Sequence, residues 1–260
     1  MRAAAAAPSF LDNGCMSHSD QTTPTPEALD LTGVERVLCV AAHPDDTEYG
    51  ISTAAAAWTD SGITVDYLLL TAGEAGIATM APEEVGPLRK KEQRDACDAV
   101  GINELIFHNF PDGCVEYGLE LRKAIAGEIR RTKPNLVVVG TWELESPWGL
   151  NHVDHRAVGL ATVDAIRDAD NPWMFRDTPE SGRWKADRLL VNGHGGPTHY
   201  VEISDEQLER GISSLEAHTV YLEALEDHPS PRELLTGVTT GGGNAAGDVG
   251  KAVLFTQFGM

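Results

Sequence analysis

The stretch "RVLCVAAHPDDTEYG", residues 36–50, joins an apolar run to a dense group of polar side chains. The run at 36–42 has the character of a buried β-strand. One histidine and three acids follow it directly. Turn formation and helix capping explain one acid, but not the whole group. Because ligands of open parallel sheets bind beyond the carboxyl ends of the strands, we expect a functional site directly after this strand.

The rest of the chain alternates apolar runs with amphipathic stretches, a pattern typical of parallel strands joined by crossover helices. We therefore predict an α/β fold: a Rossmann-like, mostly parallel sheet with helices on both faces, in a single domain with a C-terminal extension. No G-x-G-x-x-G segment opens the first crossover, so dinucleotide binding is not expected. The predicted strands are 36–42, 64–72, 104–109, 135–140 and 187–193, and the predicted helices are 49–62, 83–101, 118–134 and 154–170.

The composition restricts the classes of partner. The chain has 260 residues, enough for one domain with a complete core. Its 40 acidic and 20 basic residues give a formal net charge of −20. Nucleic acids and anionic membrane surfaces require a cationic face, so neither is an expected partner. We expect a small-molecule partner, and a homo-oligomer stays open.

The cysteines and the N-terminus indicate a reduced, cytoplasmic protein. The four cysteines are widely spaced and form no C-x-x-C pair, so neither a thiolate metal site nor a disulfide framework is predicted. The segment "MRAAAAAPSF" is too short and too weakly apolar for a signal peptide or a membrane span. Residues 1–31 are predicted to be a poorly ordered tail. Met1 and Met16 are both acceptable starts. The folded domain is predicted over 32–260.

The C-terminal part, from about residue 194, is expected to shape a substrate pocket. Its segment 205–226, "DEQLERGISSLEAHTVYLEALE", predicts one or two helices. The glycine-rich segment 236–250, "TGVTTGGGNAAGDVG", is typical of a mobile loop or linker. A lid over the strand ends is the alternative for this segment.

Polar residues after the first and fourth predicted strands form a candidate metal site. His43 and Asp46 share one turn, and "NHVDH" places His152 and His155 at the start of a helix. A catalytic zinc site needs three nitrogen or oxygen ligands and an open position for water, and two histidines plus one carboxylate meet that requirement. His152 and His155, three residues apart, face the same side of a helical turn. Asp154 is placed to orient a histidine through its second ring nitrogen.

The other histidines carry no assigned role, because a single histidine near a strand end is more often a hydrogen-bonded loop residue than a ligand. Glu48 is expected to cap the helix that begins near Gly50, with a hydrogen bond to a metal ligand as the alternative. The unassigned histidines are His108, His194, His199, His218 and His228.

Five segments, in this order, resemble the PIG-L/LmbE-like zinc-dependent N-deacetylases. "AHPDDTE" matches the A-H-P-D-D signature of that family, and "HVDHRAV" matches its H-x-D-H signature. Between them, "TAGEAG", the helix "LRKKEQRDACDAVGI" and the loop "FPDG" match further family segments. The resemblance covers about 37–166, and "EAHTVY" farther along is similar to a weaker family element.

The resemblance implies a metal centre and a catalytic base. It implies that His43, Asp46 and His155 bind one zinc ion per chain; Fe²⁺ or another divalent metal is the alternative, because histidine and carboxylate ligands suit several. It further implies that Asp45 is the general base on the metal-bound water, and that His152, if protonated, stabilises the oxyanion.

Further residues are assigned by the same resemblance. Arg89 and Asp112 match positions that contact substrate, and Asp154 is expected to favour the charged form of a neighbouring imidazole. The chain departs from the family pattern at Val153, where proline is common, and at Ala72, where arginine is frequent. Neither departure touches a predicted ligand, but Ala72 points to a different substrate pocket.

The expected function is that of a zinc-dependent amidohydrolase that removes an acyl group, expected to be acetyl, from an amino-sugar conjugate. A thiol-conjugate (mycothiol-type) amidase and a natural-product tailoring deacetylase are alternatives that keep the mechanism and change the substrate. A non-catalytic metal-binding domain of the same fold is the alternative from another class. Asp45 argues against it, because a merely structural site requires no additional carboxylate.

Overall fold

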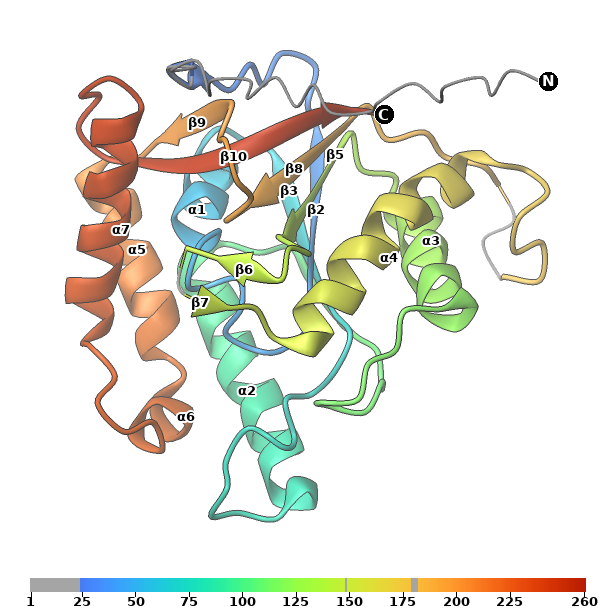
Figure 1. The fold of residues 1–260 in the computed structure, drawn as a ribbon, viewed down its shortest axis with the longest axis horizontal. Helices are drawn as coiled ribbons and strands as arrows, with labels where there is room; N and C mark the ends of the chain where they lie inside the picture. Colours follow the sequence, from blue (N-terminus) through green and yellow to red (C-terminus); the bar gives the residue numbers. More distant parts are fainter. Residues whose placement is uncertain (1–23, 148, 179–181) are drawn as a thin grey trace, which may run out of the picture.

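The centre of the fold is one large sheet, and the computed structural model describes residues 24–147, 149–178 and 182–260 (Figure 1). The strands of this sheet are β1 (Glu27–Ala28), β2 (Arg36–Ala41), β3 (Thr64–Leu69), β4 (Glu104–Phe107), β5 (Leu136–Gly140), β8 (Arg188–Asn192), β9 (His199–Glu202) and β10 (Ala252–Gly259). Their order is β1-β9-β10-β8-β5-β2-β3-β4. Neighbours from β8 to β4 are parallel, whereas β10 is antiparallel to both β8 and β9. The predicted mostly parallel sheet is therefore confirmed.

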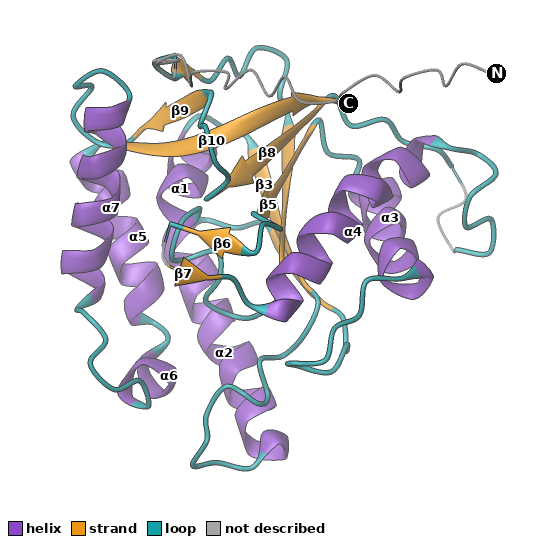
Figure 2. Ribbon diagram, viewed as in Figure 1, coloured by secondary structure: helices purple, strands orange, loops and turns teal. Residues whose placement is uncertain are grey.

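Helices cover both faces of the sheet (Figure 2). Side chains alternate between the faces along β2, so Val37 and Cys39 join one core cluster with Trp58. Leu38 and Val40 join the other cluster. None of the helices in the described ranges is long and apolar enough to cross a bilayer. One face carries α1 (Ser52–Asp60), α2 (Pro82–Val100), α5 (Asp205–Glu216), α6 (Thr219–Glu223) and α7 (Pro231–Ala245), and the other carries α3 (Leu119–Thr132) and α4 (Val153–Asp170).

A crevice lies beside β2, where the chain stops adding strands on one side of the sheet and continues on the other. From β2 the chain runs outward through β3 to β4, and α3 then returns it to β5 on the opposite side of β2. The helices after β2 and β5 pack on opposite faces of the sheet, α1 in one core cluster and α4 in the other. The two loops therefore diverge and leave an open space at the ends of these two strands. One loop carries the "HPDD" residues, and the other leads to "NHVDH".

Part of the predicted N-terminal tail forms the edge strand of the sheet. The prediction of a poorly ordered segment through residue 31 is wrong for 24–31, because Glu27 and Ala28 form a parallel strand pair with His199 and Tyr200 of β9. The partner strand lies far away in the sequence, so no local pattern reveals the pairing. The rest of the predicted tail, 1–23, lies outside the described residues.

The glycine-rich segment also differs from the prediction. Residues 236–245 are the second part of α7, not a loop, linker or lid. A Cβ atom on Gly242 would lie 2.1 Å from the Ala252 carbonyl oxygen, and one on Gly243 would lie 2.1 Å from the Gly250 carbonyl oxygen. These glycines allow the helix to approach the chain that enters β10, so they serve close packing and not mobility.

Candidate metal centre

Three side chains direct donor atoms at one point in the crevice. His43 Nδ1 lies 3.2 Å from His155 Nε2. Asp46 reaches both histidines, with Oδ1 3.0 Å from His155 Nε2 and Oδ2 3.5 Å from His43 Nδ1. Ligand atoms around a tetrahedral zinc ion lie about 3.3 Å apart, given metal–ligand distances near 2.0–2.1 Å. The three residues therefore fit a divalent cation, and His152 brings a third imidazole to the same group.

Hydrogen bonds on the far side of His43 orient its ring. His43 Nε2 lies 3.1 Å from Asp154 Oδ2 and 3.0 Å from Asp112 Oδ1. These carboxylates accept the ring proton at Nε2, which leaves Nδ1 with a free lone pair for a cation. Asp46 is held by the turn itself, because its Oδ2 accepts from the backbone N–H groups of Ala42 at 3.0 Å and His43 at 2.8 Å.

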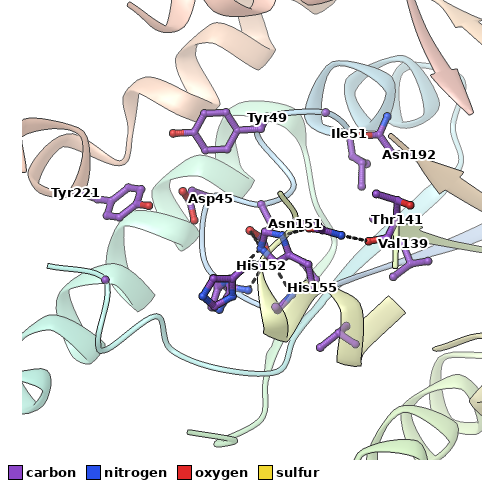
Figure 3. Close-up of a pocket in the computed structure, with 18 of the residues that line it drawn as sticks. Asp45, Tyr49, Ile51, Val139, Thr141, Asn151, His152, His155, Asn192 and Tyr221 are labelled. Carbon is purple, nitrogen blue, oxygen red and sulfur yellow. Dashed lines mark hydrogen bonds and ion pairs between the residues drawn. The ribbon is translucent and has the colours of Figure 1, made fainter. Parts of the chain in front are cut away.

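Asn151 orients the second histidine in the same way. Its amide nitrogen donates to the carbonyl oxygen of Thr141 at 2.7 Å (Figure 3) and to that of Glu143 at 3.0 Å. Asn151 Oδ1 therefore faces His155 Nδ1, at 3.1 Å, as an acceptor. This tautomer leaves Nε2 of His155 free for a cation. Sequence reasoning missed Asn151, although it stands directly before the predicted "HVDH" segment.

The electrostatic field at this point favours positive charge. Burial lowers the pKa of His43, but the carboxylates of Asp46, Asp112 and Asp154 outweigh burial and raise it. The pKa of His155 is also raised, because Asp46 outweighs burial there. Burial raises the pKa of Asp46, but the two histidines hold it well below its usual range. The same field attracts a bound cation.

Asp45 stands beside the donor group in a strained backbone conformation. Its φ of 89° is unusual for a residue other than glycine. The backbone N–H of Asp45 donates to Gln93 Oε1 at 2.9 Å, and Arg89 Nη2 donates to Asp45 Oδ1 at 2.7 Å. Burial raises the pKa of Asp45 to about 6, although the charge of Arg89 opposes this. The structure thus holds a carboxylate with a raised pKa next to the candidate metal centre.

Three of the five N–H donors of Arg89 are engaged by the protein. Its guanidinium is buried, and it donates to the carbonyl oxygens of Pro44 at 2.5 Å and Gly73 at 3.1 Å in addition to Asp45. The Tyr221 ring stacks on it, with 3.8 Å between the guanidinium carbon and the ring centroid. Contact of Arg89 with substrate stays a prediction, because these partners occupy most of its donors.

His152 is the N-cap of α4 and presents one ring nitrogen to the cavity. Its Nδ1 accepts from the backbone N–H of Asp154 at 3.3 Å, so the neutral ring carries its proton at Nε2. Burial, followed by the charge of His43, lowers the pKa of His152. A neutral imidazole with an Nε2–H donor is therefore the form that the surroundings favour.

A buried polar cluster is connected to the backbone of Asp45 by hydrogen bonds. Glu48 is fully buried and does not cap α1, which begins four residues later. Its Oε1 accepts from Gln93 at 3.2 Å and Ser214 at 3.3 Å. His218 Nε2 lies 3.6 Å from Glu48 Oε2, beyond hydrogen-bond length, and this ion-pair contact raises the pKa of His218 although burial opposes it. Gln93 thus links the buried cluster to the backbone of Asp45.

A cavity of about 830 Å³ is lined by the three-residue donor group, Asp45 and His152. Its floor includes Val40, Val139 and Val158, all buried at the strand ends and on α4. In Figure 3, Asp45 and Tyr221 lie on one side of the two labelled histidines, and Asn192 and Thr141 lie on the other. The eighth predicted residue, Asp154, lies behind His43, whereas seven line the cavity: His43, Asp45, Asp46, Arg89, Asp112, His152 and His155.

Comparison with known proteins identifies relatives of the chain. The PIG-L family, described as GlcNAc-PI de-N-acetylase, matches residues 38–166. Diacetylchitobiose deacetylase of Thermococcus kodakarensis is 31% identical over 181 residues, which cover 66% of this chain and 65% of that relative. The chain therefore spans slightly less than two thirds of that relative. A protein of Bacillus cereus described as a probable N-acetyl-α-D-glucosaminyl L-malate deacetylase 2 is 34% identical over 199 residues, 74% of this chain and 86% of the relative.

Solved structures show the same fold. N,N′-diacetylchitobiose deacetylase from Pyrococcus horikoshii superposes with a TM-score of 0.76 at 20% identity, covering 88% of this chain and 85% of that chain. The conserved protein TT1542 from Thermus thermophilus superposes with a TM-score of 0.70 at 27% identity, covering 86% of this chain and 94% of that chain. The family match over residues 38–166 and the 34% identity to the Bacillus cereus protein establish that the chain belongs to the PIG-L (LmbE-like) deacetylase family.

Proposed function

We propose that the chain is a zinc-dependent N-deacetylase that removes an acetyl group from an amino-sugar conjugate. The observation that carries the proposal is the position of Asp45, a carboxylate outside the three-residue donor group that lines the same cavity. Its strained φ of 89° costs free energy, and such strain is concentrated at functional sites. A metal-binding domain without catalysis would require neither the strain nor the additional carboxylate. The names of the relatives, which describe deacetylases of N-acetylated sugars, support the substrate class.

The metal ligands in this proposal are His43, Asp46 and His155. A divalent cation held there would lower the pKa of a water molecule and polarise the amide carbonyl. Zinc is the proposed metal, because two imidazoles and one carboxylate with an open position are typical of catalytic zinc sites. Asp154 and Asn151 act on the two histidines through their outer ring nitrogens, so each ring presents its free nitrogen to the metal.

Asp45 moves the proton in the proposed reaction. Its ionised carboxylate accepts one proton from the attacking water as the new C–O bond forms. It then donates that proton to the amide nitrogen as the C–N bond breaks, which yields the free amine and acetic acid, and the acid releases its proton to water as acetate. With a pKa of about 6, Asp45 is mostly ionised at neutral pH and still close enough to neutrality to return the proton.

His152 donates a hydrogen bond to the carbonyl oxygen as that oxygen gains negative charge. Its Nε2–H is available in the neutral ring, because Nδ1 is engaged by the backbone of Asp154. Loss of one such donor typically costs about 10²–10³-fold in kcat.

The free thiols of Cys39, Cys97 and Cys114 support a reducing, cytoplasmic location for the enzyme.

The test of this function combines metal content and amine release in one preparation. Elemental analysis should find about one zinc ion per chain. Primary-amine release should follow from at least one member of a panel of N-acetylglucosaminides, glycosyl-inositols and thiol conjugates, and a chelator should stop it. A folded, metal-loaded protein that releases no amine from the whole panel contradicts the proposal. Release without metal, or unaffected by a chelator, contradicts the assigned centre.

A further inference from the structure

The outer wall of the cavity is apolar, and the described residues that line the cavity include no lysine and one arginine, which is paired with Asp45. We infer that the group attached to the amino sugar is neutral and packs an apolar face on this wall, and that carboxylate-bearing conjugates are poor substrates. The inference rests on the proposed deacetylase function and specifies its substrate. We call the surface formed by Tyr221, Pro229, Leu234 and Val238 the α6–α7 wall.

The α6–α7 wall lies at the mouth of the cavity. Val238 is 47% exposed, Pro229 is exposed, and Tyr221 and Leu234 are partly buried. The floor, by contrast, is closed by buried side chains at the ends of β2 and β5. An acetyl group is small enough for the closed side, whereas the larger conjugated group must extend toward the open side. The wall is therefore in the path of the conjugated group.

The charges in the cavity are unfavourable for an anionic substituent. Among the described lining residues, Arg89 is the one arginine and there is no lysine. Its guanidinium is already bonded to Asp45, Pro44 and Gly73. The lining also contains three carboxylates, of Asp45, Asp46 and Asp112. A carboxylate that packs on the α6–α7 wall, whose four side chains carry no charge, would lose hydration without gaining an unpaired cation, which costs free energy.

Two polar side chains that line the cavity, Tyr49 and His228, are paired with each other. Tyr49 Oη lies 2.9 Å from His228 Nε2, and the two rings meet edge to face with centroids 5.7 Å apart. Together with Tyr221 they add aromatic surface beside the apolar side chains of α7. Aromatic and aliphatic side chains bind apolar faces, and few polar groups are needed to set the orientation of a ligand.

The inference is tested with three N-acetylglucosaminides that differ only in the attached group: benzyl, inositol and malyl. The values of kcat/KM are compared by amine release at about pH 8, where ordinary imidazoles are uncharged. The metal-loaded full chain should favour the benzyl compound over the malyl compound by about tenfold or more, with the inositol compound between them. Equal or better turnover of the malyl compound would overturn the inference.

A charge introduced at the wall provides the second test. Val238→Lys should raise the malyl-to-benzyl ratio of kcat/KM by about fivefold to tenfold, because a surface cation can then pair with the carboxylate. Leu160→Lys is the matched control, since Leu160 is 43% exposed on α4 and does not line the cavity. An equal change in the ratio for both lysine variants would contradict a role for the α6–α7 wall.

Binding separates this inference from the proposed reaction. Calorimetry with the three deacetylated glucosaminides measures their binding affinities without any turnover, and so reports on contacts with the α6–α7 wall. Tighter binding of the benzyl amine than of the malyl amine, with no amine release from the acetylated forms, would support the wall and reject the proposed reaction. Equal binding of the two amines, with normal turnover of both acetylated forms, would contradict the inferred preference of the α6–α7 wall for a neutral group. The proposed deacetylation would not be affected by that result.

Discussion

Arg89 Nη2 donates to Asp45 Oδ1 at 2.7 Å, and both side chains are almost fully buried. The same guanidinium bonds to the carbonyl oxygen of Pro44, the residue directly before Asp45. Gln93 holds the backbone N–H of Asp45 from the same helix that carries Arg89. Helix α2 thus fixes the carboxylate, the backbone and the preceding carbonyl of the proposed base. Positioning of this kind lowers the barrier because the reacting groups need no further ordering.

Replacement of the proposed base should abolish turnover and leave the metal in place. Asp45→Asn removes the ionisable oxygen, and asparagine tolerates the positive φ of this position better than other residues. We expect kcat to fall by about 10²–10⁴-fold. Zinc content, measured by elemental analysis of the same sample, should not change. Loss of zinc in this variant, or a kcat within about threefold of the wild type, would contradict the assigned role.

Arg89→Lys distinguishes positioning of the base from contact with substrate. Lysine cannot reproduce the fork that reaches Asp45, Pro44 and Gly73 together. If Arg89 positions Asp45, kcat falls by about 100-fold and KM changes little. A raised KM at unchanged kcat would indicate substrate contact, as the family resemblance implies. Arg94→Lys, at a position on the exposed side of α2, is the control and should change neither constant.

Asp154→Asn should weaken metal binding. Asp154 Oδ2 accepts from His43 Nε2 and from the backbone of Gly113, so the amide would disturb the orientation of the ring. Loss of an outer partner of a metal-binding histidine typically costs about 10- to 100-fold in affinity. Competition with a chromophoric chelator measures the zinc affinity. Asp164→Asn, farther along α4, should retain the wild-type affinity, and equal affinities in both variants would exclude this role for Asp154.

The buried pair of His218 and Glu48 predicts a pH-dependent contribution to stability. The raised pKa of His218 means that the folded protein holds this proton more tightly than the unfolded chain. The contribution is complete below the ordinary pKa of about 6.5 and disappears as pH rises through the folded value. His218→Gln should therefore reduce the free energy of unfolding more at about pH 5.5 than at about pH 9. Urea unfolding at both pH values measures this, and a pH-independent loss would argue against the ion pair.

Two neighbouring glycines in α7 should respond in opposite directions to alanine. Gly242→Ala places a methyl group against the Ala252 carbonyl oxygen, so we expect a loss of about 1–3 kcal/mol in the free energy of unfolding. A Cβ atom on Gly241 would meet no other atom of the described chain within 4 Å, so Gly241→Ala should gain about 0.5–1 kcal/mol from helix propensity. Thermal or urea unfolding of both variants provides the comparison. Equal effects of the two substitutions would show that α7 does not pack against the start of β10 in this way.

Local sequence patterns were sufficient for much of the fold and for the candidate centre. The apolar runs that became β2, β3, β4, β5 and β8 were recognisable because the strands of a parallel sheet covered by helices need nearly continuous apolar side chains. The polar residues after β2 and before α4 were recognisable because such groups are costly to bury without a function or a partner. The structure brings His43, Asp46 and His155 together, as their positions at strand ends indicated.

Longer-range features could not be predicted in this way. The strand pair between β1 and β9 joins segments far apart in the chain, and β10 returns antiparallel between β8 and β9. The triple glycine in α7 indicated a loop because local propensity disfavours glycine in helices. Tertiary packing overrides that preference, since only glycine allows the close approach to the chain before β10.

Residue types and their spacing were enough to identify the residues of the candidate site and to predict that they follow the strands of a parallel sheet. Which atom each of these residues presents to the cavity became visible in the folded chain. Asn151 and Asp154 select the free nitrogens of His155 and His43, and Arg89 is bound to Asp45. Residue type and spacing are properties of the linear sequence, so they are known before the chain folds. Ring orientation, proton position and burial depend instead on groups that distant segments bring into contact.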